Sequence, residues 1–96
     1  MRVPDPPYDK IAARALVVDV RTPAEFPSGA YPGAINIPVF EVEKRLAEFG
    51  DRKRAIVVYC HSGNRSAQAK AILERNGFLD VSNGGALERR TVWRTE

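Results

Sequence analysis

The sequence predicts a single α/β domain built on a mainly parallel sheet of four to five strands, flanked by helices. Residues 15–20 (ALVVDV) and 55–59 (AIVVY) are short, uninterrupted, valine-rich runs. Such runs are typical of strands that are buried on both faces of a parallel sheet. Segments with helical spacing alternate with them, as in strand–helix–strand units. The length of 96 residues suits one compact domain, residues 1–96.

The first half of the chain reads as an arm, a strand, a turn and a second strand. Residues 1–10 are rich in proline and are expected to form an extended arm. After the first valine run, a short helix is expected over residues 22–26, with Thr22 as its cap. A loop rich in proline and glycine follows over 27–33, and residues 34–37 (AINI) predict a short strand. No clear strand precedes the first valine run, which favours four strands over five.

The second half of the chain predicts two helices and two strands. The helices cover residues 40–49 and 66–76, and Gly50 and Gly77 stand where they should end. Apolar residues at helical spacing give each helix a buried face: Val42, Leu46 and Phe49 in the first, and Ala69, Ile72 and Leu73 in the second. The second valine run lies between them, and residues 80–82 predict a last short strand.

Composition and charge narrow the function classes. The net charge of +3, from 15 basic and 12 acidic residues, is mild, and no basic run is interleaved with aromatic residues. We therefore expect no nucleic-acid partner. No apolar run is long enough to span a membrane, and the N-terminus lacks the apolar core of a signal peptide. One cysteine cannot form an internal disulfide, so a cytoplasmic protein is expected. One cysteine and one histidine are too few for a zinc site, and we expect no metal or other cofactor.

Residues 58–66 (VYCHSGNRS) point to cysteine chemistry. A buried strand delivers Cys60 to a short polar loop, and a helix begins directly after it. Unpaired N–H groups of the loop, together with the helix dipole, favour a negative charge at the sulfur. We therefore expect a thiolate nucleophile near neutral pH rather than an inert buried cysteine. Gly63 permits a tight backbone conformation, Ser66 can cap the helix, and Arg65 places a cation near the sulfur.

The spacing of this loop argues against other cysteine chemistries. A cysteine protease needs a histidine from a distant part of the chain, but the sole histidine, His61, is adjacent to Cys60. Four residues separate Cys60 from Arg65, one fewer than in the loop of tyrosine-phosphatase-type enzymes. The shorter loop predicts a pocket too small for a tetrahedral phosphate. This disfavours a phosphatase or an arsenate reductase.

The same loop, residues 60–66 (CHSGNRS), resembles the active-site loop of rhodanese-like sulfurtransferases. Other segments resemble further motifs of that family: DVR at 19–21 with EF at 25–26, PGAINIP at 32–38, and NGG at 83–85 with Trp93. The resemblance implies that Cys60 takes the outer sulfur of a small anionic donor such as thiosulfate and releases sulfite. The resulting persulfide then passes its sulfur to cyanide or a thiol.

The resemblance also implies roles for the residues around Cys60. The loop residues are expected to bind substrate: His61, Ser62, Gly63, Asn64, Arg65 and Ser66. Arg65 has two candidate partners, the anionic donor and Asp19, and both can apply. Asp19 and Arg21 are expected to support the site. Arg21 and Glu25 lie four residues apart, and a surface pair on one helical turn is expected.

Several other residues have structural expectations. His61 and Asn64 should point outward at the rim of the site. Asn36 should bind the backbone, and Trp93 should pack the C-terminal end. Members of the family often have His-Ile before the Pro-Gly of the second motif, whereas residues 30–31 here are Ala-Tyr. We therefore expect a missing polar contact or a different packing of that loop.

Two function classes remain open at this point. The first is an enzyme, a thiosulfate sulfurtransferase. The second is a binding module that takes a persulfide on Cys60 and relays it between partner proteins. An inactive interaction domain is disfavoured because the cysteine is present. Turnover of thiosulfate separates the first class from the second.

Overall fold

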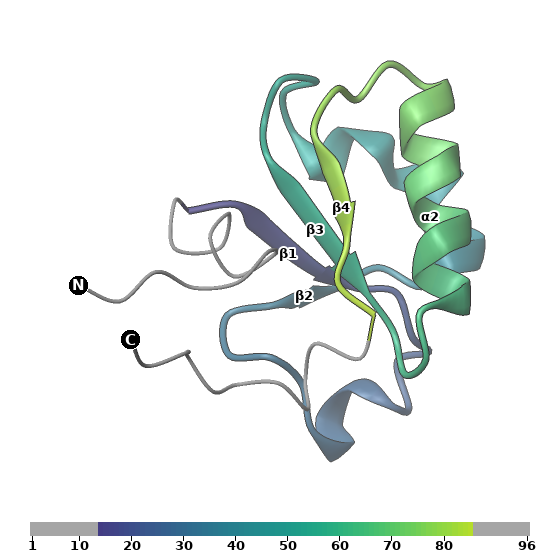
Figure 1. Ribbon diagram of the computed structural model, residues 1–96. Helices are drawn as coiled ribbons and strands as arrows, with labels where there is room; N and C mark the ends of the chain where they lie inside the picture. Colours follow the sequence, from purple (N-terminus) through teal and green to yellow (C-terminus); the bar gives the residue numbers. More distant parts are fainter. Residues whose placement is uncertain (1–13, 86–96) are drawn as a thin grey trace.

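The computed structural model describes residues 14–85, and they form a four-stranded parallel sheet with the order β2-β1-β3-β4 (Figure 1). The strands are β1 (Leu16–Asp19), β2 (Ile35–Asn36), β3 (Ile56–Tyr59) and β4 (Val81–Asn83). The fold class is as the sequence predicts. The arm at 1–10, a fifth strand before β1 and Trp93 all lie outside the described residues.

Both central strands are buried on both faces, which explains their continuous apolar sequences. Side chains of β3 alternate between two clusters. Val58 joins the main core on one face, whereas Val57 and Tyr59 join a smaller cluster with Tyr31 on the other face. These three side chains of β3 are fully buried. Each such side chain contributes about 1.5–3 kcal/mol of transfer free energy, so the sheet is well anchored.

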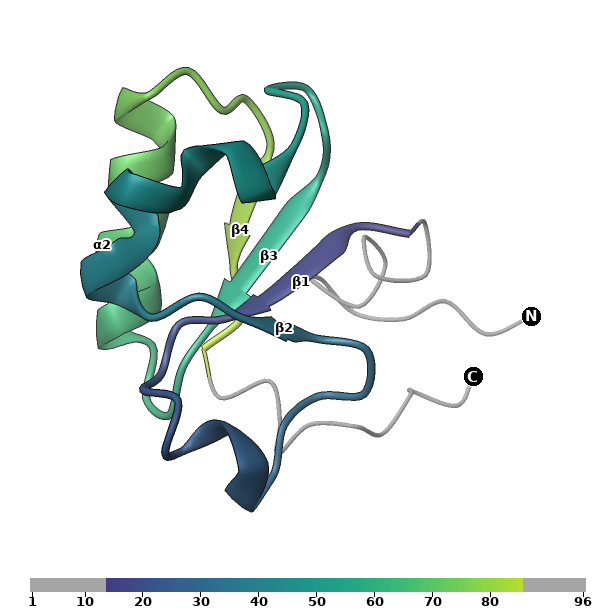
Figure 2. The ribbon, with the colours of Figure 1, turned by 180° about the vertical axis from the view of Figure 1, so that it is seen from behind.

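Two helical segments cover one face of the sheet, as Figure 2 shows from behind. They are η2 (Val39–Phe49) and α2 (Asn64–Arg75). The core between them and the sheet includes Leu73 and an edge-to-face pair of Phe49 and Phe78, with ring centroids 6.1 Å apart. Within residues 14–85, no helix has the length and apolar character that crossing a bilayer requires.

The prediction of a regular helix over 40–49 is only partly right. Segment η2 is a tight 3-10 helix that breaks at Arg45, where φ is −121° and ψ is 32°. The break allows Val42 and Phe49, on opposite sides of it, both to reach the core. The Arg45 guanidinium donates to Glu41 and Glu48 across the break, at 2.9 and 2.6 Å. A 3-10 helix has about 3.0 residues per turn and an α-helix about 3.6, and over so short a segment the sequence pattern does not distinguish the two.

The prediction of a helix over residues 22–26 is wrong, although Thr22 does make the hydrogen bonds of a capping residue. A turn covers these residues, and a 3-10 helix, η1 (Phe26–Ser28), follows. The Thr22 N–H and hydroxyl donate to the Glu25 carboxylate at 2.9 and 3.0 Å, and the Glu25 N–H lies 3.3 Å from the Thr22 hydroxyl oxygen. This reciprocal arrangement is that of a capping box, and it fixes the Glu25 side chain directly after β1.

Candidate active site

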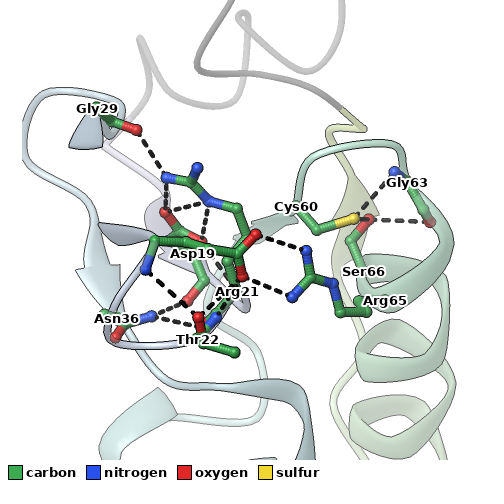
Figure 3. Close-up of polar contacts among 10 residues, drawn as sticks. Asp19, Arg21, Thr22, Gly29, Asn36, Cys60, Gly63, Arg65 and Ser66 are labelled. Carbon is green, nitrogen blue, oxygen red and sulfur yellow. Dashed lines mark hydrogen bonds and ion pairs between the residues drawn. The ribbon is translucent and has the colours of Figure 1, made fainter. Parts of the chain in front are cut away.

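Cys60 lies at the carboxyl end of β3, where the chain turns into α2 (Figure 3). This is the edge of a parallel sheet at which ligands commonly bind. The residue is fully buried, with 0% of its surface exposed. Its backbone N–H donates to the carbonyl of Gly85, at 2.9 Å, so the start of the loop is held by the segment after β4.

The sulfur of Cys60 is surrounded by hydrogen-bond donors of its own loop. The Gly63 N–H donates to Sγ at 2.9 Å, and the Ser66 hydroxyl lies 3.5 Å from it. Burial raises the pKa of Cys60, because a thiolate is costly in an apolar environment. The Ser66 hydroxyl and the N–H groups of Ser66, Gly63 and Ser62 act in the opposite direction, and the net pKa lies below its ordinary value. This agrees with the expected thiolate.

Gly63 makes this geometry attainable. It is the N-cap of α2, with φ at +100° and ψ at −13°, and side chains rarely adopt such a conformation. Its N–H therefore turns toward the sulfur while its carbonyl accepts the first bond of the helix, from the Ala67 N–H at 3.0 Å. The expected permissive role of this glycine is confirmed.

Ser66 is not the helix cap that the sequence suggested. Helix α2 begins two residues earlier, at Asn64, so Ser66 lies buried within the first turn. Its hydroxyl contacts the Gly63 carbonyl at 3.1 Å and the Asn83 amide oxygen at 2.6 Å, in addition to the sulfur. Gly63 occupies the N-cap position, and the Ser66 hydroxyl lies next to the sulfur instead.

Asn83 is a site residue that was not expected. It stands at the end of β4, and its amide group donates to the Gly63 carbonyl at 3.2 Å and accepts from the Gly85 N–H at 2.9 Å. Together with the bond to Ser66, these contacts tie the cysteine loop to β4. The signal was present in the sequence, because the carboxyl ends of neighbouring parallel strands meet at one edge.

Arg65 pairs with Glu25 and not with Asp19 as expected, whereas its role in binding the anionic donor stays a prediction. Two guanidinium nitrogens of Arg65 donate to the two carboxylate oxygens at 2.8 and 3.1 Å. The carboxylate that Arg65 contacts is thus that of Glu25 and not that of Asp19, and the buried ion pair of Arg21 is with Asp19. Hydrogen bonds from Arg65 and from the Thr22 N–H lower the pKa of Glu25 to about 2. The pair raises the pKa of Arg65 as well.

Asp19 and Arg21 form a buried ion pair of their own at the end of β1. The Arg21 guanidinium donates to Asp19 at 2.6 and 3.0 Å and to the Gly29 carbonyl at 2.7 Å (Figure 3). It also lies over the ring of Tyr59, 5.9 Å from the centroid. Asn36 donates to the carbonyls of Asp19 and Arg21, as its expected backbone role requires. These contacts fix the ends of β1 and β2 beneath the site.

At the Ala-Tyr departure, residues 30–31, the structure shows a polar contact made by the backbone, and the loss of a side-chain contact there stays a prediction. The backbone N–H of Tyr31 donates to the Tyr59 hydroxyl at 2.9 Å, which needs no particular side chain at position 31. The rim residues His61, Ser62 and Asn64 are exposed, as expected for the first and last of them. Over residues 14–85, no three His, Cys, Asp or Glu side chains gather into a metal-binding cluster.

The chain is similar in sequence and in fold to known proteins. The family model of the rhodanese-like domain matches residues 7–85. The Escherichia coli protein thiosulfate sulfurtransferase PspE is 42% identical over 72 residues, which are 74% of this chain and 69% of that protein. The Bacillus subtilis putative sulfur carrier protein YrkF is 39% identical over 67 residues, 70% of this chain but only 36% of that protein. A solved structure described as rhodanese with anions from E. coli matches with a TM-score of 0.74 and 34% identity, covering 85% of this chain and 99% of the other. The chain therefore belongs to the rhodanese-like domain family.

Proposed function

We propose that this protein moves a sulfane sulfur from thiosulfate or a similar anionic donor to cyanide or a thiol, through a persulfide on Cys60. The observation that carries the proposal is the hydrogen bond from the Gly63 N–H to Sγ, at 2.9 Å, within a loop that lowers the pKa of Cys60. A thiolate is the nucleophilic form of cysteine. The same donors that stabilise the thiolate can stabilise the negative persulfide that replaces it.

The reaction consists of two displacements. In the first, the Cys60 thiolate attacks the outer sulfur of thiosulfate; a sulfur–sulfur bond forms, the bond to the sulfonate group breaks, and its electron pair leaves with sulfite. In the second, cyanide attacks the terminal persulfide sulfur, thiocyanate leaves, and the thiolate is restored. A thiol acceptor gives the acceptor's persulfide instead. Each step conserves atoms and charge without a metal or a redox partner.

Some residues of the loop contact the sulfur, and others are exposed to solvent. Gly63, Ser62 and Ser66 supply donors to the sulfur, and Arg65 supplies a cation for an anionic donor. His61 and Asn64 lie at the exposed rim, where the leaving group and acceptor must pass. Asp19 and Arg21 act indirectly by fixing the adjacent strand end. A loop with four residues between Cys60 and Arg65 suits one added sulfur atom better than a phosphate group.

Release of sulfite and formation of thiocyanate from thiosulfate and cyanide test this proposal. We expect steady turnover by the full chain and none by Cys60→Ser. Aryl phosphates should not be hydrolysed. Phosphate hydrolysis without sulfur transfer would overturn the assignment and favour the phosphatase reading.

A second candidate is a persulfide carrier that serves a partner protein. It is favoured by the similarity to a protein named as a putative sulfur carrier. A carrier would accept one sulfur from a donor and release it slowly to cyanide, but rapidly to its partner. One stoichiometric burst of sulfite without further turnover would identify this behaviour.

A further inference from the structure

The cation beside the nucleophile is neutralised by a specific carboxylate. Arg65 lies in the first turn of α2, five residues after Cys60, and its side chain extends from the helix toward the end of β1 (Figure 3). Two of its nitrogens donate to the two oxygens of Glu25, at 2.8 and 3.1 Å. This bidentate geometry is the strongest form of an arginine–carboxylate contact. Arg65 therefore presents the site with a positive group whose field is largely cancelled a few ångströms away.

Glu25 is fixed in this position by its own turn. Its carboxylate also accepts from the Thr22 N–H at 2.9 Å and from the Thr22 hydroxyl at 3.0 Å. The side chain is thus held from the β1 side of the site, 40 residues before its partner on α2. A pKa of about 2 keeps Glu25 ionised throughout the neutral range. The cancellation of charge is a constant feature of the folded protein near neutral pH.

The pair remains open to solvent, so a small ion can reach it. The Glu25 side chain is 37% exposed and the Arg65 side chain is 33% exposed. A guanidinium carries more N–H donors than the two that Glu25 occupies, so an anion can still bind Arg65 while the pair is intact. Glu25 reduces the electrostatic attraction between Arg65 and a negatively charged donor. The reduction in binding energy grows with the charge of the donor.

We propose that Glu25 determines the charge selectivity of the site by competing with anionic sulfur donors for Arg65. The inference rests on the proposed function, because it concerns the donor of that reaction. It makes Glu25 a specificity-determining residue that weakens binding of a dianion more than binding of a monoanion. The site then accepts donors of lower charge nearly as well as thiosulfate.

The substitution Glu25→Gln tests this directly. Glutamine keeps an oxygen that can accept from Thr22 and Arg65, and it removes only the charge. The two donors are thiosulfate, a dianion, and methanethiosulfonate, a monoanion that carries the same reactive sulfur–sulfonyl bond. We expect KM to fall about tenfold for thiosulfate and about threefold for methanethiosulfonate, because the Coulomb energy scales with the donor's charge and halving it gives the square root of the factor. The kcat values should change little.

Two further variants serve as controls for this result. Glu48→Gln makes the same change in net charge at an exposed pair with Arg45, away from the cysteine loop, and should leave both KM values unchanged. Arg65→Gln should have the opposite effect to Glu25→Gln and raise KM for thiosulfate more than for methanethiosulfonate. Thermal unfolding of each variant establishes that it is folded before its kinetics are compared.

The outcomes separate this inference from the proposed function. If the wild-type protein transfers no sulfur from either donor, the proposed function is wrong, and the selectivity inference that rests on it is wrong as well. If the wild-type protein is active but Glu25→Gln leaves KM unchanged, or lowers it equally for both donors, the selectivity inference is wrong. A fall in kcat alone would also overturn it, since it would assign Glu25 a purely structural part.

Discussion

Replacing Gly63 with alanine should weaken the Cys60 thiolate at a measurable cost in stability. Gly63 has φ at +100°, which costs an alanine roughly 1–2 kcal/mol. A steric clash is not the reason for this cost. The nearest atom to a Cβ at this position would be Gly85 Cα, at 3.6 Å, which is an ordinary van der Waals distance. The alanine can relieve the strain only by rotating the backbone, and this moves the N–H away from the sulfur.

The effect on the sulfur follows from the bond that is lost. A hydrogen bond to a charged group contributes about 1.5–3 kcal/mol, and about 1.4 kcal/mol corresponds to a factor of ten. The pKa of Cys60 should therefore rise, and alkylation by iodoacetamide at neutral pH should slow by about tenfold or more. Gly77→Ala is a matched control. Gly77 has φ at +90°, and its nearest contact is a flexible Arg52 side chain at 3.7 Å, beyond the end of α2.

Chemical denaturation and the pH dependence of alkylation measure both quantities. Gly63→Ala and Gly77→Ala should lose similar free energies of unfolding, but only Gly63→Ala should shift the alkylation profile to higher pH. An unchanged profile for Gly63→Ala would refute the role of its N–H in stabilising the thiolate. An equal shift in both variants would mean that lost stability, and not the hydrogen bond, controls the reactivity of the cysteine.

Three other outcomes test the network around the site. Asp19→Asn removes the carboxylate charge from the buried pair with Arg21 and should cost about 3–5 kcal/mol in urea unfolding; a loss below about 1 kcal/mol would contradict a stabilising buried pair. Glu25 has a pKa near 2 when folded against an ordinary 4.5, so its contribution to stability is complete above pH 4.5 and is lost as the pH falls toward 2. Because the pair is partly exposed, the free energy of unfolding of the wild-type protein should approach that of Glu25→Gln over this range by about 1 kcal/mol or less, and a constant difference would contradict the pairing. Asn83→Ala removes three hydrogen bonds to the loop and its flank, and should cost about 1–3 kcal/mol and slow persulfide formation; normal transfer would show that the tie to β4 is dispensable.

The sheet and the cysteine loop could be predicted because their signals are local. The run at residues 55–59 is continuous because β3 has two buried faces, and the step from that run to Cys60 and a polar loop defines the carboxyl edge of the sheet. The conformation of Gly63 follows from the same short segment. The exact start of α2 could not be predicted from this segment. A helix that is capped by a glycine in a left-handed conformation lacks the serine or aspartate that marks most helix starts.

The choice of ion-pair partners could not be predicted, because it depends on tertiary structure. Arg21 and Glu25 have the spacing of a helical pair, but the chain turns between them and sends one side chain to Asp19 and the other to Arg65. Spacing along a sequence predicts a contact only if the backbone conformation is right. The signal for Asn83 is weaker than that for the loop for a related reason, since its position next to the loop depends on β4 pairing with β3.

The mass of the intact protein after exposure to thiosulfate tests the central claim most directly. We predict a gain of about 32 Da, the mass of one sulfur atom, on a single residue, Cys60. Cyanide or a thiol should remove the added mass, and Cys60→Ser should never acquire it. An unmodified wild-type protein, or an adduct that persists in Cys60→Ser, would contradict sulfur transfer through this cysteine.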